Sequence, residues 1–281
     1  MPPSGRFAQP FQDYEILGRF GSGGMGTVFQ ARRKSDGLEV AIKVLRPSLS
    51  RNARFVERMR REAEISMRLD HPGLVKGYGF GEEGGYHYVV MESCAGRTLA
   101  ALLKAWGSFP EERVLDLGIQ LAEALACAHD GGVIHRDVKP SNIVVDDDGR
   151  AKLMDLGLAK AESDPTLTRD GGTVGTPQYM SPEQAEAPTQ VDERSDLYSL
   201  GATLYHMVVG SPPFEGDSAA HVLTRLLGER VVPASQVEPS VSRGLDLVLR
   251  RLLMRRPEDR YASARELVAD LRAVQRGKAP S

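Results

Sequence analysis

The sequence predicts an α+β fold, with strands concentrated before about Ser93 and helices after it. Two observations carry this prediction. The first third of the chain contains short runs rich in valine, isoleucine and tyrosine, separated by turns that contain glycine, whereas the remainder contains longer segments with apolar residues every three or four positions. The composition, 41% hydrophobic and 26% charged over 281 residues, is that of a globular protein with room for one two-part unit or two domains.

Charge and cysteine content exclude several classes of function. The formal net charge of −2 provides no overall basic field, so nucleic acid is not expected as a partner. The two cysteines, Cys94 and Cys127, show no CxxC spacing, which favours a reducing compartment and argues against a disulfide framework or a zinc site. The longest apolar stretch, residues 197–209, is interrupted by polar residues and is too short to span a bilayer. We therefore expect a cytoplasmic location and no membrane segment in this chain.

The first strands surround a glycine-rich segment. Residues 1–12 are rich in proline, glycine and glutamine and are expected to be flexible, and a β-like pattern begins at Tyr14. The cluster GSGGMG at residues 21–26 continues into the strand-like VFQA, and a second strand is predicted at residues 38–45. In a dinucleotide-binding βαβ unit the same glycines would open a helix, so this context favours a glycine-rich β-hairpin. Glycine lets backbone N–H groups approach phosphate oxygens closely.

A lysine and a charged helix follow. Lys43 lies in the middle of an apolar strand, where an unpaired ammonium would be costly, so an anionic partner is expected. Residues 51–69 predict a helix with many arginines and several glutamates, among them Glu62 and Glu64.

The middle of the chain contains a predicted metal site. A strand at residues 86–91 and an amphipathic helix at 110–130 lead to a short apolar run at 143–145, followed by a turn rich in aspartate and a return strand at 152–154. A hairpin of that length brings Asn142 and Asp155 to the same end. Two oxygen ligands at one point suit Mg²⁺, which is commonly held by one or two protein ligands together with substrate phosphates.

The remainder of the chain is predicted to be mostly helical. Residues 158–180 show no periodicity and read as a long loop, a length that is usually functional. Helices are expected at four places along the sequence that follows, at residues 196–210, 219–227, 243–254 and 263–275.

Several of these segments resemble the motifs of protein kinases. HRDVKPSN at residues 135–142 is similar to their catalytic loop, and DLG at 155–157 is similar to their DFG motif with Leu156 in place of Phe. VAIK at 40–43 and GTPQYMSPE at 175–183 also match, and Met25 replaces the aromatic residue often seen at the tip of the glycine-rich loop. The resemblance runs from about Tyr14 to Arg276.

The resemblance implies the bilobal protein kinase fold. A flexible N-terminus at residues 1–12 would precede a kinase domain at 13–276, followed by a tail at 277–281. The domain would consist of a small, mainly β N-lobe at about 13–92 and a larger, mainly α C-lobe at about 93–276.

The resemblance also assigns the catalytic roles. Asp137 would accept the proton of the substrate hydroxyl, and Lys139 would steady the γ-phosphate. Asn142 and Asp155 would hold Mg²⁺, with Mn²⁺ as an alternative metal. Lys43 would pair with the α- and β-phosphates of ATP and with Glu62, which lies nine residues before His71, the usual spacing in kinases.

ATP would be enclosed by the glycine-rich loop, the strands beside it and the hinge. Met91 would be the gatekeeper at the back of the pocket, and the backbone of Glu92 and Cys94 would bond to adenine. The residues implied in nucleotide binding are Phe20, Gly21, Ser22, Gly23, Gly24, Met25, Gly26, Val28, Ala41, Lys43, Met91, Glu92, Cys94 and Val144.

Regulatory and structural residues are implied as well. Arg136, beside the catalytic acid, would receive a phosphate placed by autophosphorylation on Thr166 or Thr168, with Thr173 as the next candidate. Thr176 would belong to the shelf that binds the substrate, where it contacts Asp137 and Lys139. Two elements would be structural: an ion pair between Glu183 and Arg260, and Asp196, which would brace the backbone of the catalytic loop.

These implications lead to a Ser/Thr protein kinase that uses Mg-ATP to phosphorylate proteins. The glycine-rich loop and SPEQA resemble the bacterial branch of eukaryotic-like kinases, some of which are cytoplasmic domains of membrane-anchored chains, and a homodimer would serve autophosphorylation in trans. The alternative is an ATP-binding pseudokinase scaffold, whose usual mark is loss of a catalytic residue, although Lys43, Asp137, Asn142 and Asp155 are all present. A small-molecule phosphotransferase is a third interpretation, against which the peptide shelf at 175–183 argues.

Overall fold

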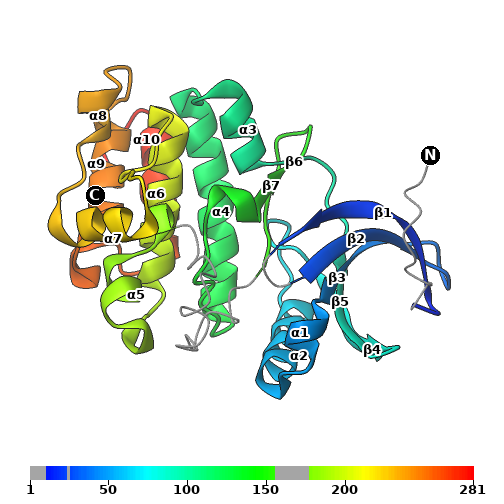
Figure 1. Ribbon diagram of the computed structural model, residues 1–281. Helices are drawn as coiled ribbons and strands as arrows, with labels where there is room; N and C mark the ends of the chain where they lie inside the picture. The colour runs from blue at the N-terminus through cyan, green and yellow to red at the C-terminus, as the bar shows by residue number, and fades with distance from the viewer. Residues whose placement is uncertain (1–10, 24–25, 156–176) are drawn as a thin grey trace. The chain divides into compact units, whose positions relative to one another are not determined.

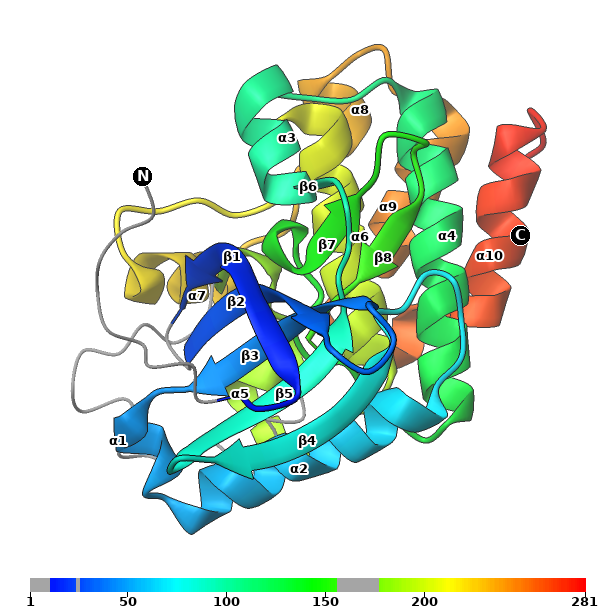
Figure 2. The same cartoon turned by 90° about the vertical axis from the view of Figure 1, so that its right-hand side faces the viewer.

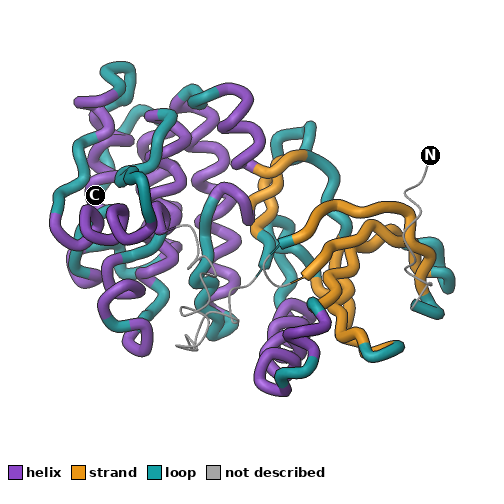
Figure 3. The backbone as a smooth tube through the Cα atoms, in the orientation of Figure 1, coloured by secondary structure: helices purple, strands orange, loops and turns teal. Residues whose placement is uncertain are grey.

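The structure is a computed structural model that describes residues 11–23, 26–155 and 177–281. The chain divides into two compact units, and Figure 1 follows the chain through both. Most strands belong to the first unit and most helices to the second, as the colouring of Figure 3 shows. This distribution is the predicted α+β class.

The division differs slightly from the predicted lobes. The first unit extends to Cys94 rather than to about residue 92, and it lacks the segment His71–Leu74, which belongs to the second unit. That segment pairs within the second unit, because Leu153 donates its backbone N–H to the carbonyl of Gly73 at 2.8 Å and Leu74 forms an isolated parallel bridge with Leu153. No pattern in the sequence indicates that residues 71–74 belong to the second unit.

The first unit is built on a five-stranded antiparallel sheet. Its strands in spatial order are β1 (Tyr14–Ser22), β2 (Gly26–Arg33), β3 (Glu39–Leu45), β5 (Tyr86–Glu92) and β4 (Gly77–Glu83). Two helices follow β3, the short α1 (Pro47–Ser50) and the longer α2 (Ala53–Arg68), whose N-terminus is capped by the side chain of Asn52. The helix α2 packs against β4 and β5 and runs alongside β4 in Figure 2.

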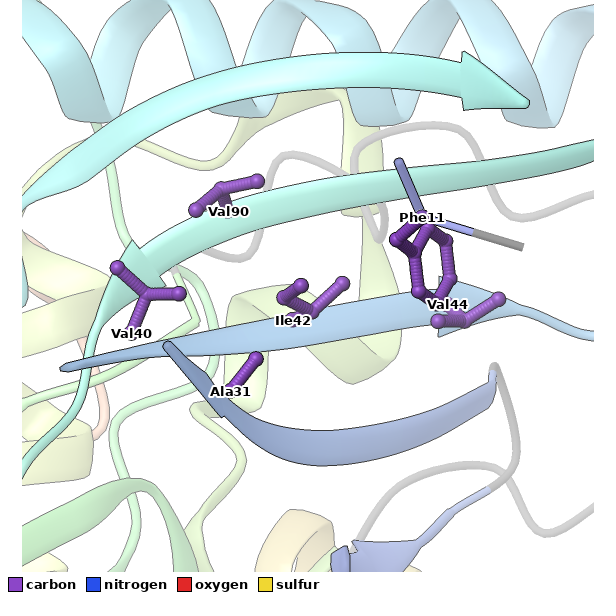
Figure 4. Packing of buried hydrophobic residues seen from close by; sticks show 6 residues of the cluster. All are labelled: Phe11, Ala31, Val40, Ile42, Val44 and Val90. Atoms are coloured by element: carbon purple, nitrogen blue, oxygen red, sulfur yellow. The ribbon is translucent and has the colours of Figure 1, made fainter. Parts of the chain in front are cut away.

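Side chains alternate between the two faces of this sheet. On β3, Val40, Ile42 and Val44 point to one face, where they pack with Val90 and other apolar residues in the cluster of Figure 4. Ala41 and Lys43 therefore lie on the opposite face. That opposite face also carries residues of β5 that pack against α2.

The packed part of the first unit begins at Phe11, before the end of the N-terminal segment that the sequence predicted to be flexible. Phe11, which we assigned to the flexible N-terminus, is only 3% exposed, and its ring lies 4.8 Å from that of Tyr88 in an edge-to-face contact. Gln12 donates its backbone N–H to the carboxylate of Glu83. The prediction was wrong for these two residues because one aromatic side chain completes the apolar cluster on the sheet.

The second unit is mainly helical. It contains a small three-stranded sheet in the order β6 (Arg97–Thr98), β7 (Ile143–Val145) and β8 (Ala151–Leu153). Its α-helices are α3 (Leu99–Trp106), α4 (Glu111–Asp130), α5 (Pro182–Glu186), α6 (Arg194–Val209), α7 (Ala219–Gly228), α8 (Ala234–Val237), α9 (Arg243–Leu252) and α10 (Ala264–Gln275). Short 3₁₀ turns lie at Pro140–Asn142, Pro177–Tyr179, Pro188–Gln190 and Pro257–Asp259. Almost every residue of α6 is buried, α4 and α9 pack against it, and α10 packs against both α4 and α9.

Most of the predicted elements are present within a few residues of their expected ends. The strand at 143–145 and the helices that became α2, α4, α6, α7, α9 and α10 are confirmed. The sequence missed β4 and β6, whose glycine content or shortness gives no period-two signal, and it missed α1, α3, α5 and α8. The helix α3 has only eight residues, too few to show a clear helical periodicity in the sequence.

The close approach of β2 to β3 yields a test of the glycine-rich hairpin. A Cβ atom on Gly26 would lie 1.9 Å from the backbone oxygen of Val44, so Gly26→Ala must push the two strands apart. We expect it to lower the free energy of unfolding by about 1–3 kcal/mol, as overpacking usually does. The measurement is urea denaturation, with Gly23→Ala as the matched control, because a Cβ on Gly23 meets nothing within 4 Å. Equal midpoints for the two variants would contradict the steric argument.

Candidate active site

A buried carboxylate organises the predicted catalytic loop. Asp196, in the first turn of α6, is fully buried and accepts the backbone N–H groups of His135 and Arg136, each at 2.7 Å. It also lies 2.9 Å from Nε2 of His129. A buried charge is tolerated when it is fully hydrogen-bonded, and the N-terminus of a helix favours an anion. The brace implied for Asp196 is therefore present, and His129 is a partner that the sequence analysis did not include.

The backbone of Arg136 is strained. Its φ angle is +62°, in the left-handed region that non-glycine residues enter at a cost of about 1–2 kcal/mol. The bond from its N–H to Asp196 helps to hold this conformation. Such a residue is characteristic of functional sites, and here it directly precedes Asp137.

The imidazole of His135 connects the catalytic loop to the predicted metal-binding segment. His135 is buried, and burial lowers the pKa of its ring below the usual value, which favours the neutral form. Its Nδ1 accepts the backbone N–H of Asp137 at 3.2 Å, so Nε2 carries the proton and donates to the carbonyl of Met154 at 2.9 Å.

Asp155 is held in the same way as Arg136. The backbone N–H of Met154 donates to the carbonyl of Asn142 at 2.8 Å, and the Met154 carbonyl accepts from His135, so both peptide groups of the preceding residue are fixed. Asp155 itself has a φ angle of +54° and an exposed side chain. Arg136 and Asp155 are the two non-glycine residues with positive φ in the described part of the chain.

The carboxylate of Asp137 is oriented by two neighbours. Its Oδ2 lies 3.0 Å from Nζ of Lys139 and accepts from Nδ2 of Asn142 at 2.9 Å. The same Nδ2 also donates to the backbone carbonyl of Asp137 at 2.9 Å. Lys139 offsets the charge of the carboxylate, while Asn142 fixes its orientation relative to the backbone.

The donor set fits a hard cation. Both N–H bonds of the Asn142 amide are used by Asp137, which leaves Oδ1 as the atom that Asn142 can offer to a metal. An amide oxygen and the carboxylate of Asp155 are ligands that Mg²⁺ accepts. Mg²⁺ is commonly completed by substrate phosphates and water, and no cluster of three or more His, Cys, Asp or Glu side chains suited to a metal occurs among the described residues.

The ion pair implied for Glu183 and Arg260 is present and buried. Nη1 and Nη2 of Arg260 contact the two carboxylate oxygens of Glu183 at 2.7 and 2.8 Å. Its remaining N–H groups donate to the carbonyls of Met254, Arg194 and Arg255. Burial would raise the pKa of Glu183, but the bonds from Arg260 outweigh it, and the pKa is lowered. The pair therefore anchors the start of α5.

The described end of the predicted substrate shelf is packed against α6. The hydroxyl of Tyr179 lies 2.6 Å from Nδ1 of His206, and the two rings are stacked. Burial raises the pKa of Tyr179 and lowers that of His206, so the phenol donates to a neutral imidazole. His206 is a further residue that the sequence analysis missed.

In the first unit, the predicted phosphate-binding lysine shares a face of the sheet with the predicted adenine contacts. Val28 lies opposite Lys43 on β2, and Met91 lies opposite Ala41 on β5, so all four side chains share one face. On that side α2 packs its buried residues, and Glu62 lies next to them.

The choice of Glu62 over Glu64 is supported by their positions on α2. Glu62 follows Met59 by three residues and adjoins Ala63, and both of these are buried against the sheet. Glu64, by contrast, is exposed.

The glycine-rich loop is braced by an arginine that the sequence analysis did not identify. Gly23 donates its N–H to the carbonyl of Gly26 at 2.9 Å, and its own carbonyl accepts from Nη2 of Arg46 at 2.6 Å. The hydroxyls of Ser22 and Thr27 are 2.8 Å apart across the hairpin. These contacts shape the flanks of the loop.

At the predicted hinge, the backbone of Glu92 is partly committed. Its N–H donates to the carbonyl of Lys76 at 2.8 Å, so that N–H is already used within the first unit. Cys94 is partly buried, with Sγ 4.0 Å from the Glu92 carbonyl. Phe20, expected beside adenine, is 54% exposed, whereas Val144 of β7 is buried in the second unit.

Several predicted residues cannot be placed. Gly24, Met25, Leu156, Thr166, Thr168, Thr173 and Thr176 lie outside the described residues. In the part of the chain that is described, no helix combines the length and the apolar character needed to cross a membrane.

The fold and the catalytic segment together define a protein kinase domain. The family model "Protein kinase domain" matches residues 14–271, so the chain belongs to this family. The fold class and the family predicted from the sequence are thereby confirmed.

The relatives place the chain among bacterial serine/threonine kinases. Serine/threonine-protein kinase PknB of Mycobacterium leprae is 41% identical over 272 residues, which cover 95% of this chain and 44% of the relative. A probable serine/threonine-protein kinase of Clostridium perfringens is 37% identical over 263 residues, covering 94% of this chain and 38% of the relative. The chain thus spans about two fifths of the length of the curated relatives it matches.

A solved structure shows the same architecture. The kinase domain of PknI from Mycobacterium tuberculosis superposes with a TM-score of 0.74 at 30% sequence identity, over 94% of this chain and 97% of that one. The similarity extends over both units of the chain described above.

Proposed function

We propose that this chain transfers the γ-phosphate of Mg-ATP to serine or threonine hydroxyls of protein substrates. The observation that carries the proposal is the placement of the Asp137 carboxylate. Lys139 and Asn142 fix the side chain of Asp137, while Asp196 fixes the backbone before it. A carboxylate held in this way can accept a hydrogen bond from a hydroxyl and align it for attack, which is the role of the catalytic aspartate in protein kinases.

The remaining residues neutralise charge and position the nucleotide. Lys43 would pair with phosphate oxygens, and Lys139 would stabilise the transferring phosphoryl group. Mg²⁺, when bound through Asn142 and Asp155, would screen the phosphate charges and orient them. Because the transition state is largely dissociative, positioning and electrostatics account for most of the rate.

The proposal is tested by incubating the protein with labelled ATP and a generic basic protein as acceptor. We expect Asp137→Asn to reduce transfer by about 10²–10⁴-fold, the usual contribution of a general base, while binding of a fluorescent ATP analogue stays close to wild type. Asp147→Asn is the matched control, since Asp147 is an exposed carboxylate in the turn after β7.

Three results would contradict the assignment. Transfer by Asp137→Asn close to the wild-type rate would remove Asp137 from the reaction. Nucleotide binding without transfer by the wild type would favour a pseudokinase scaffold, and ATP consumption without labelling of protein would favour a small-molecule phosphotransferase.

We also propose that the activation segment is regulated by autophosphorylation at Thr166 or Thr168, with Thr173 as the next candidate. The support is Arg136, which directly precedes Asp137 in the sequence. Its backbone N–H is bonded to Asp196. A phosphothreonine carries about −1.5 to −2 charges, and an arginine can pair with it through two parallel bonds. A homodimer would allow this phosphorylation in trans, and a cytoplasmic location would supply ATP.

Mass spectrometry of the wild type and of Asp137→Asn tests this regulation. We expect phosphate between residues 159 and 175 in the wild type and none in the variant, because the variant cannot phosphorylate itself. The double variant Thr166→Ala/Thr168→Ala should then lose most of its activity towards the acceptor protein. Wild-type protein without phosphate in this range, or full activity of the double variant, would refute the regulation and leave the kinase assignment intact.

A further inference from the structure

The helix α5 begins with a capping box whose glutamine, Gln184, also forms a hydrogen bond outside the helix. Oε1 of Gln184 accepts the backbone N–H of Ser181 at 3.0 Å and its hydroxyl at 3.2 Å, while Oγ of Ser181 accepts the N–H of Gln184 at 3.4 Å. This reciprocal arrangement satisfies donors at the start of the helix. It uses the oxygen of the Gln184 side chain and leaves the amide nitrogen for another partner.

That partner is the catalytic loop. Nε2 of Gln184 donates to the backbone carbonyl of Arg136 at 3.0 Å, across 48 positions of sequence. The N–H of Arg136 is already bonded to Asp196. Each of the two peptide groups that flank the strained Cα of Arg136 is therefore bonded to a helix: the preceding one to Asp196 of α6, and the following one to Gln184 of α5.

We propose that Gln184 is a positioning residue for the catalytic aspartate. The carbonyl that it binds belongs to the peptide group joining Arg136 to Asp137, whose N–H is bonded to Nδ1 of His135 at 3.2 Å, so Gln184 and His135 together fix the orientation of this group. Asp196 alone fixes only the preceding peptide group. Because Arg136 has a φ angle of +62°, this peptide group is freer to turn toward commoner conformations when only the longer bond to His135 remains.

The support for Gln184 is itself rigid. The neighbouring Glu183 is clamped by the two parallel bonds from Arg260, and Ser181 is fully buried. The bond to Arg136 thus joins the catalytic loop to a fixed helix start. Small displacements of reacting groups have large effects on rate, so a residue in this position acts on turnover more than on binding.

The chemistry of the side chain explains why glutamine is needed here. Glutamate serves a capping box as well as glutamine does, because the box requires only an acceptor. The Arg136 carbonyl, however, requires a donor, and a carboxylate would set two acceptors about 3 Å apart. Gln184→Glu therefore retains the cap and removes the contact to Arg136.

The inference rests on the proposed function, because it concerns the alignment of Asp137 for transfer. We expect Gln184→Glu to lower kcat about five- to tenfold, the factor that corresponds to the loss of one hydrogen bond, with KM for ATP within about twofold of wild type. The thermal midpoint should fall only slightly, since a single contact is lost and the capping box is kept. Gln190→Glu is the matched control, as it makes the same change at an exposed position six residues along the chain.

A second variant and a second readout separate positioning from a structural role. Gln184→Ala loses the side-chain half of the capping box as well as the contact to Arg136, so its thermal midpoint should fall as well as its kcat. Hydrogen exchange of a peptide covering residues 134–142 should be faster in Gln184→Glu than in Gln190→Glu. This readout needs no activity, so it tests the positioning contact even if the wild type transfers no phosphate, the result that would refute the proposed function.

Two results would overturn the inference. One is a kcat and an exchange rate for Gln184→Glu equal to those of Gln190→Glu. The other is a thermal midpoint as low as that of Gln184→Ala with kcat per folded molecule unchanged, which would assign Gln184 to the helix cap alone.

Discussion

The geometry of the catalytic segment depends on a single buried carboxylate. Asp196 accepts two consecutive backbone N–H groups, those of His135 and Arg136, and neither oxygen has access to solvent. Removing one partner from a buried charged network usually costs about 3–5 kcal/mol, because the charge that remains is left uncompensated. The catalytic loop is therefore coupled to α6, the most deeply buried helix of the second unit.

Hydrogen bonds to the backbone also hold the residues that would contact substrate and metal. Arg136 and Asp155 occupy left-handed conformations that cost about 1–3 kcal/mol each. Arg136 directly precedes the predicted catalytic Asp137, and Asp155 is itself a predicted metal ligand. Their strain is sustained by bonds to the neighbouring peptide groups, through Asp196 for one and through His135 and Asn142 for the other. The functional carboxylates are thus placed mainly by fixed backbone, which is a form of preorganisation.

Local sequence signals were sufficient for much of the fold, and the resemblance to protein kinases supplied the candidate site. The apolar run around Lys43 predicted the strand β3, and the segment from Asn142 to Asp155 predicted a hairpin that the structure contains as β7 and β8. Features that depend on long-range contacts were not visible. The burial of Phe11 and the assignment of Gly73 to the second unit rest on partners distant in sequence, which leave no periodic pattern.

Side chains that bond to distant backbone groups were the hardest to foresee. Arg46 and Gln184 read as ordinary polar residues, and only the structure shows their carbonyl partners. The positive φ of Arg136 was equally hidden, since only glycine would have signalled it in the sequence. Gln184 did carry one signal, because Ser181 three residues before it completes the pattern of a capping box.

The most direct test of this account is a crystal structure of the Asp196→Asn variant beside that of the wild type. An amide in place of the carboxylate presents N–H groups to backbone donors that need an acceptor. If Asp196 holds the loop, Arg136 will leave the left-handed region in the variant, and the backbone from His135 to Asp137 will shift. If Arg136 keeps a φ angle near +62° and the loop is unchanged, the buried carboxylate is not what fixes the catalytic segment, and the central claim is wrong.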